Sequence, residues 1–370
     1  MAVNRRHFLS GLAAAGAVAG FSSQQTIAGT SKKTPLIVDG LDVSVLDENF
    51  IKMLRKGGVH CVHKSMGDAL HYGKMYHFIE QHSEDLVLAK TVADIHQAKK
   101  DGKIAIVSGT QGGGQLIGEA LIKAGKYSAI TETLEAYHGL GLRILMLAYN
   151  TNNIFGGGNL NPSSPLTRAG RVLVEEMHKL KIIVDVGGHV GEKTSLDAIA
   201  MSSGIPVICS HTNMAGINPN LRATSDRVCE GIARTGGVIG ITSISDFHTR
   251  SIKNYKQHGT QSPQATLDQH LDQYDYLKKL VGIDHVGLGP DFVCGSEEAF
   301  TNLLQNLDDS LNFPPEMLSE GSIKLVDGYK DISEVGNVIK GLKNRGWSQK
   351  ELSKLLGGNW LRVYKQVWGA

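Results

Sequence analysis

The chain has 370 residues, 41% of them hydrophobic and 20% charged, which is typical of a globular protein with a substantial core. Its 38 basic and 36 acidic side chains leave a formal charge of +2. The sequence contains no long basic run with interleaved aromatic residues, so nucleic acid is not expected as a partner.

Residues 1–28 have the features of an export signal. Arg5 and Arg6 precede a short apolar run at 11–21, and residues 26–28 offer a small-residue cleavage site. The paired arginines resemble the twin-arginine type, so we expect delivery to the periplasm. The alternative is a basic amphipathic helix of the folded domain, but a Gly/Ala-rich segment makes a poor helix without packing partners. The run is too short for a comfortable membrane span, so no stable span is expected after cleavage.

Nine short apolar runs bounded by glycine or polar residues predict buried strands. They cover residues 35–43, 58–63, 86–89, 104–108, 143–148, 182–186, 206–209, 237–242 and 285–289. Helix-like spacing at 166–181 and 224–235 alternates with them, which favours one α/β domain over residues 29–370, a TIM-type (β/α)8 barrel. An open doubly wound sheet is the alternative, but no GxGxxG follows the first strand. Segments 249–263 and 295–329 are expected to form long loops over the site.

The four cysteines are Cys61, Cys209, Cys229 and Cys294. An oxidising compartment would permit two disulfides. Three of the four lie in or just after apolar strand-like runs, so buried, unpaired thiols are the favoured interpretation.

Polar side chains close most of the predicted strands. They are Asp39 and Asp42, His63, Gln111, Tyr149 and Asn150, His189, His211, and Asp291. In a (β/α)8 barrel the C-terminal ends of all strands meet at one mouth. Two imidazoles and a carboxylate there suit a divalent metal, although any single strand-end histidine is more often hydrogen-bonded structure. Spacing alone leaves both interpretations open.

Longer motifs help to decide between a metal site and structural histidines. They are Ser210-His211-Thr212-Asn213 and the segments 166–177, 236–240, 287–292 and 358–363. Together these motifs resemble the membrane dipeptidases (renal dipeptidase, peptidase family M19) over nearly the whole mature chain. The resemblance implies a metal-dependent hydrolase whose barrel holds two zinc ions.

Four residues keep the roles that the resemblance implies. His211 matches one histidine ligand of the second metal site, and His189 matches the other if residues 186–188 contain one extra residue. Asp291 matches the acid/base of the last strand, and Arg222 matches the arginine that binds the carboxylate of a dipeptide. Asn150 is expected to contact substrate as well.

Other positions depart from the family pattern. Leu41 stands where the first strand of the family has a ligand histidine, and Gln111 replaces the bridging glutamate. Asp42 serves as a metal ligand only if one residue is deleted before it, because adjacent strand residues face opposite ways. Tyr149 replaces a histidine, although its hydroxyl could still donate to an oxyanion. A neutral amide cannot offset two dications, so we expect at most one ion per chain, zinc or another divalent metal.

His60 and His63 stand near the end of the second predicted strand. They are candidates for replacement ligands. The alternative is that both are ordinary hydrogen-bonded histidines.

Two functions remain open. The first is an exported metallohydrolase that cleaves a dipeptide or related small amide with one metal. The second is a family member without peptidase activity, such as a binding protein or a maturation factor in siderophore biosynthesis. A small peptide-like substrate is the expected partner, and a homodimer is left open.

Export is expected to depend on the paired arginines, because the apolar run that follows them is weak. Replacing Arg5 and Arg6 with lysine should leave the precursor in the cytoplasm, as measured by fractionation and immunoblotting. Unchanged periplasmic delivery of the double variant would contradict the twin-arginine interpretation.

Overall fold

The computed structural model describes residues 35–249, 263–294 and 324–369. The predicted export signal lies outside the described residues. So do most of the two segments that the sequence predicts as loops over the site.

The strands form two parallel sheets. The strands are β1 (Val38–Asp42), β2 (Cys61–Ser65), β3 (Leu86–Leu88), β4 (Ile104–Gln111), β5 (Leu142–Met146), β6 (Ile183–Asp185), β7 (Cys209–Thr212), β8 (Ile239–Ile241) and β9 (Val286–Leu288). One sheet has the order β1-β2-β4-β5-β6, and the other has the order β7-β8-β9. β3 pairs with the beginning of β4, outside this order.

Two single bridges join the sheets into a ring. Asp185 at the end of β6 pairs in parallel with Ile208, just before β7. Asp42 at the end of β1 pairs in parallel with Phe292, after β9. The sheet therefore closes on itself as an eight-stranded parallel barrel, with β3 as an additional strand beside β4.

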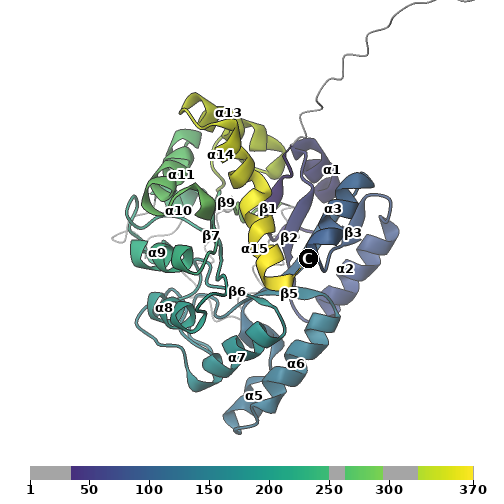
Figure 1. Ribbon diagram of the computed structural model, residues 1–370, viewed down its shortest axis with the longest axis vertical. Coiled ribbons are helices and arrows are strands. Elements are labelled where there is room, and N and C mark those ends of the chain that lie inside the picture. Colours follow the sequence, from purple (N-terminus) through teal and green to yellow (C-terminus); the bar gives the residue numbers. More distant parts are fainter. Residues whose placement is uncertain (1–34, 250–262, 295–323, 370) are drawn as a thin grey trace, which may run out of the picture. The chain divides into compact units, whose positions relative to one another are not determined.

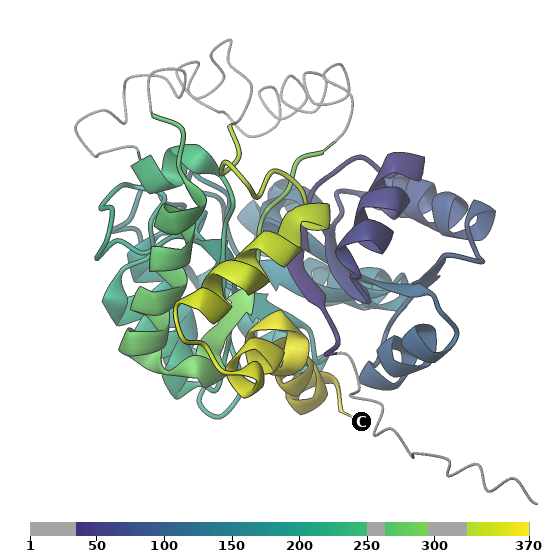
Figure 2. The same cartoon turned by 90° about the horizontal axis from the view of Figure 1, so that it is seen from above.

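Helices follow most of the strands and surround them (Figure 1). They are α1 (Glu48–Gly57), α2 (Ala69–Gln81), α3 (Val92–Lys100), α4 (Gly113–Leu116), α5 (Glu119–Lys123), α6 (Ser128–Gly139), α7 (Arg168–Lys179), α8 (Glu192–Met201), α9 (Asp226–Arg234), α10 (Ser245–Thr249), α11 (Leu267–Val281), α13 (Val335–Asn344), α14 (Gln349–Ser353) and α15 (Asn359–Trp368). Figure 2 shows the same arrangement turned by 90°. A large apolar cluster includes residues of these helices and of the strands.

A second apolar cluster lies at the N-terminal ends of the strands. It joins α15 to the first residues of several strands, among them Val38, Cys61 and Ile183. Trp360 of α15 is fully buried and donates its indole N–H to the carbonyl of Leu288 at 2.9 Å. α15, yellow in Figure 1, thus closes one end of the barrel and leaves the opposite end for the polar strand ends.

The sequence predicted all nine strands, with shifted bounds. The largest shift concerns the run predicted at 206–209, because β7 spans Cys209–Thr212 and carries the polar Ser210, His211 and Thr212. All four residues of β7 are buried, so the strand continues through polar positions that apolar periodicity could not detect. All four cysteines are free, and all except the half-buried Cys294 are buried, as expected.

Closure of the barrel end by Trp360 should be important for stability. Trp360→Ala removes a buried indole and its hydrogen bond, so we expect the free energy of unfolding to fall by about 3–5 kcal/mol in urea denaturation. Leu70→Ala, at a side chain that is 63% exposed, is the control and should change stability by less than about 0.5 kcal/mol. Equal effects of the two substitutions would contradict this role of α15.

Candidate metal centre

Three ligand-bearing side chains meet at the C-terminal ends of the strands. His189, His211 and Asp291 are buried, and one potential ligand atom of each lies within 4.8 Å of the others. They follow or belong to β6, β7 and β9. Two atoms that each lie about 2.1 Å from one ion are at most about 4.2 Å apart, so small side-chain adjustments would let all three reach one ion.

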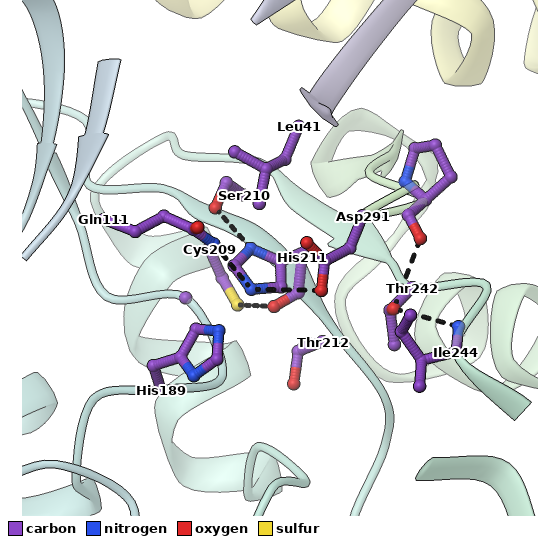
Figure 3. Close-up of polar contacts among 12 residues, drawn as sticks. Leu41, Gln111, His189, Cys209, Ser210, His211, Thr212, Thr242, Ile244 and Asp291 are labelled. Atoms are coloured by element: carbon purple, nitrogen blue, oxygen red, sulfur yellow. Dashed lines mark hydrogen bonds and ion pairs between the residues drawn. The ribbon is translucent and has the colours of Figure 1, made fainter. Parts of the chain in front are cut away.

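His211 is the centre of the group. Its Nε2 atom lies 3.7 Å from a carboxylate oxygen of Asp291 and 3.3 Å from the amide nitrogen of Gln111. Its other ring nitrogen lies 2.8 Å from the hydroxyl oxygen of Ser210. Figure 3 shows these three contacts converging on the imidazole ring.

His189 is held from two sides. Its Nδ1 lies 2.6 Å from the amide oxygen of Asn150, so Nδ1 carries the proton and donates it to this oxygen. The ring of Tyr149 stacks on that of His189 at a centroid distance of 3.8 Å. The Nε2 lone pair of His189 is therefore available for a metal ion.

The protonation states of the two histidines suit cation binding. Burial, followed by the nearby charge of Arg222, lowers the pKa of both His189 and His211 well below the usual value. Both rings are thus neutral and can act as ligands. Burial also raises the pKa of Asp291 to about 7, with Arg222 opposing and Asp42 adding to the shift.

Two residues of the centre have a left-handed backbone conformation. Asn150 has a φ of 56° and Asp291 has a φ of 59°. Such a conformation costs a non-glycine residue about 1–2 kcal/mol. The backbone N–H of Asp291 donates to the carbonyl of Leu41 at 3.1 Å, which helps to fix the turn that aims its carboxylate at His211.

The predicted ligand Asp42 does not join the cluster. β1 contains an irregularity between Asp39 and Asp42, where its register with β2 shifts. The carboxylate of Asp42 accepts hydrogen bonds from Lys64 at 3.1 Å and from the backbone N–H of Ser44 at 2.8 Å. Both side chains of the Asp42–Lys64 ion pair are buried, so the ammonium group of Lys64 is the counter-charge of this carboxylate.

Leu41 and Gln111 lie at the centre but bring no charge to it. Leu41 is fully buried and belongs to neither apolar cluster; Figure 3 shows it among the polar residues of the site. Gln111 directs its amide nitrogen to the Nε2 atom of His211. The residues present therefore fit one divalent ion held by His189, His211 and Asp291, and they do not fit a carboxylate-bridged pair of ions.

Arg222 and Tyr149 lie close enough to the centre to influence it. Arg222 is buried against Phe247, with its guanidinium carbon 4.9 Å from the ring centroid. Loss of hydration, with Asp291 adding and Arg222 opposing, raises the pKa of Tyr149. Its hydroxyl thus stays protonated and can donate a hydrogen bond.

Neither candidate replacement ligand belongs to the cluster of His189, His211 and Asp291. His60 precedes β2 at the opposite end of the barrel, where its Nδ1 accepts the backbone N–H of Ile37 at 3.2 Å. His63 is buried and donates from Nδ1 to the carbonyl of Gly40 at 2.7 Å. The ordinary hydrogen-bonded interpretation therefore holds for both histidines.

Sequence reasoning missed three residues that support the site. Asp185 ends β6 and binds Ser210, which in turn contacts His211. Lys64 neutralises Asp42. The position of Ser210 directly before His211 was visible in the sequence, but its link to Asp185 depends on the pairing of β6 with β7.

A closed parallel barrel with a histidine and carboxylate cluster at its C-terminal mouth has the features of the TIM-type metallohydrolases. A family model described as membrane dipeptidase (peptidase family M19) matches residues 63–320 and 316–369. The chain belongs to this family, whose members are metal-dependent dipeptidase-like hydrolases.

Individual relatives agree with this membership. The chain is 29% identical over 290 residues to an uncharacterised protein in the pqqA 5′ region of Klebsiella pneumoniae, which covers 76% of this chain and 89% of that protein. It is 26% identical over 313 residues to dipeptidase tcpJ of Claviceps purpurea, covering 81% of this chain but only 62% of that longer protein. A solved amidohydrolase from Pseudomonas aeruginosa superposes with a TM-score of 0.76 at 26% identity, covering 91% and 97% of the two chains.

Within the described part of the chain, no helix combines the length and the apolar character that a membrane crossing requires.

His63 should make the metal-free protein sensitive to acid. Burial lowers its pKa to about 4, so the folded protein keeps the ring neutral while the unfolded chain takes up a proton below about pH 6.5. Its contribution to stability is present above pH 6.5 and is lost as the pH falls toward 4, by up to about 1.4 kcal/mol per pH unit.

His63→Gln keeps a donor for Gly40 but cannot take up this proton. We therefore expect the stability advantage of the wild type over the variant to shrink as the pH falls from 6.5 to 4, measured by urea unfolding. Parallel pH profiles of the two proteins would show that His63 is not buried as a neutral ring.

Proposed function

We propose that this protein is an exported dipeptidase-like hydrolase that works with one divalent metal ion per chain. The observation that carries the proposal is the convergence of His189, His211 and Asp291, with both imidazoles neutral. Zinc suits a site of two imidazoles and one carboxylate, and such an ion, when bound, would polarise the scissile carbonyl as a Lewis acid.

The restriction to one ion follows from charge. Two adjacent dications need a bridging anion, but Gln111 is neutral, Leu41 is apolar and Asp42 is neutralised by Lys64. A second ion in this mouth would have to share Asp291 with the first, because Asp291 is the one carboxylate in the cluster of His189, His211 and Asp291 among the described residues. The Coulomb repulsion between two dications at short range outweighs what that arrangement can offset.

The remaining residues suit a small peptide as substrate. Arg222 is a permanent cation near the cluster and fits the C-terminal carboxylate of a dipeptide. The protonated hydroxyl of Tyr149 is suited to stabilise an oxyanion. Asn150, whose amide oxygen holds His189 in place, would contact the substrate as well. Asp291 would hold the ion through one carboxylate oxygen, and its second oxygen is suited to accept a proton from the attacking water and return it to the leaving amine.

Export to the periplasm through the twin-arginine signal is part of the same proposal, and it rests on the sequence of residues 1–28.

Metal content tests the proposal most directly. Protein recovered from the periplasm should contain about one equivalent of divalent metal by mass spectrometric elemental analysis and should hydrolyse dipeptides. His189→Ala and His211→Ala should each weaken metal binding on the order of 100-fold or more, because loss of a supporting residue outside the ligand set already costs about 10–100-fold. His77→Ala, at an exposed residue of α2, is the matched control and should retain the metal.

Restoring a negative charge at position 111 and a histidine ligand at position 41 should change the number of metal ions bound per chain. Leu41→His combined with Gln111→Glu should raise the metal content above one equivalent and increase dipeptide hydrolysis. Two tightly bound ions in the unmodified protein would overturn the single-metal proposal. One bound ion without hydrolysis of any dipeptide would instead favour a family member that binds or matures another compound.

A further inference from the structure

A buried chain of hydrogen bonds connects Asp185 to His211 through Ser210. The hydroxyl of Ser210 donates to one carboxylate oxygen of Asp185 at 2.5 Å, and the same hydroxyl oxygen lies 2.8 Å from Nδ1 of His211. Asp185 and Ser210 are each at most 1% exposed, and His211 is fully buried. We name these three residues the Asp185 relay, and Figure 3 shows its Ser210–His211 contact.

The direction of every proton in the relay is determined by its neighbours. The second oxygen of Asp185 accepts the backbone N–H groups of Gly187 at 2.8 Å and Ser210 at 2.9 Å. Three donors therefore surround an acceptor-only carboxylate. Because the single hydroxyl proton of Ser210 points to Asp185, its oxygen has only lone pairs to offer to His211. Nδ1 of His211 must then carry the ring proton.

The other side of the ring agrees with this tautomer. The amide nitrogen of Gln111, which can only donate, lies 3.3 Å from Nε2 of His211. Nε2 must therefore present a lone pair toward the centre, as a metal ligand does.

The backbone is shaped to hold the relay. β7 has an irregular register with β8 between Cys209 and Thr212, and there the side chains of the neighbouring residues Ser210 and His211 contact each other. Glycines surround Ser210 closely: a Cβ atom on Gly240 or Gly289 would lie 2.2 or 1.9 Å from its carbonyl oxygen. A Cβ on Gly187 would lie 3.1 Å from its hydroxyl. Larger residues at these three positions would displace Ser210.

We propose that Asp185 and Ser210 are positioning residues that fix the tautomer of His211 and thereby set the metal affinity of the centre. Asp185 also places a negative charge behind the ring, in a centre where Gln111 supplies none. His189 has the neutral amide of Asn150 in the corresponding place, so the two imidazoles are not equivalent. His211 is the more strongly electron-donating ligand of the pair.

Asp185→Asn should reverse the direction of the hydrogen bonds in the relay. The side-chain oxygen of asparagine would keep the two backbone donors, so its amide nitrogen would face Ser210 and donate to it. The hydroxyl of Ser210 would then donate to Nδ1 of His211 and drive the ring proton to Nε2, the ligand atom. Ser210→Ala removes the hydroxyl that links Asp185 to His211, but it places no new donor beside Nδ1 of His211.

Two measurements on the full-length protein test the relay. The first is the tautomer of His211 in metal-free protein, read from its ¹⁵N NMR shifts and assigned by loss of the signal in His211→Ala. We expect Nδ1–H in the wild type and Nε2–H in Asp185→Asn. The second is the zinc dissociation constant by chelator competition, which should rise about 10–100-fold in both Asp185→Asn and Ser210→Ala.

Ser108→Ala is the matched control. Ser108 is a fully buried strand serine that donates to Tyr72 at 2.7 Å and takes no part in the relay. It should leave both the tautomer and the zinc affinity unchanged, so that a general loss of packing is distinguished from loss of the relay.

The affinity measurement rests on the proposed metal function, whereas the tautomer measurement does not. An Nε2–H tautomer in the wild type would overturn the relay. The relay would also be overturned if Asp185→Asn kept the wild-type tautomer of His211 and the wild-type zinc affinity. If Asp185→Asn does not fold, wild-type zinc affinity in Ser210→Ala would overturn it. The expected tautomers without zinc binding to any protein would support the relay and refute the metal function.

Discussion

The burial of carboxylates at the barrel mouth is the constraint on which the rest of the site depends. Asp42, Asp185 and Asp291 are at most 8% exposed, and a buried carboxylate is costly unless other groups stabilise its charge. Different groups stabilise the charge of each carboxylate. Asp42 has the ammonium of Lys64, Asp185 has three hydrogen-bond donors, and Asp291 lies beside the neutral His211 with Arg222 as a more distant counter-charge. Asp291 has the weakest stabilisation of the three, and burial raises its pKa to about 7, compared with about 6 for Asp185.

This distribution divides the mouth into two unlike halves. On the side of β1, β2 and β4, Lys64 neutralises Asp42, and the uncharged residues Leu41 and Gln111 stand at positions where the family has metal ligands. On the side of β6, β7 and β9, the ligand atoms of His189, His211 and Asp291 remain directed at one another. The candidate metal ligands therefore lie in the second half, which also contains the Asp185 relay.

Membership in the membrane dipeptidase family does not by itself determine the chemistry of this chain. The fold places side chains at the strand ends, but the type of side chain decides how many ions the mouth can hold. An amide at position 111 keeps the size of a glutamate while removing its charge and adding two donors. In this structure one of those donors approaches the lone pair of His211, so the substitution changes both charge and hydrogen bonding.

The sequence by itself determined the barrel class, the nine strands and the two histidines, because apolar runs and the Ser-His motif are local signals. It also indicated that Leu41 and Gln111 depart from the family, since residue types are read directly. Only the tertiary structure decided that Asp42 binds Lys64 instead of joining the cluster, because the irregularity in β1 changes the face of the strand on which this residue lies. The link between Asp185 and His211 likewise depends on the pairing of β6 with β7 and on the irregular register of β7. Residues 25 positions apart come within hydrogen-bond distance there, and no local pattern encodes such a contact.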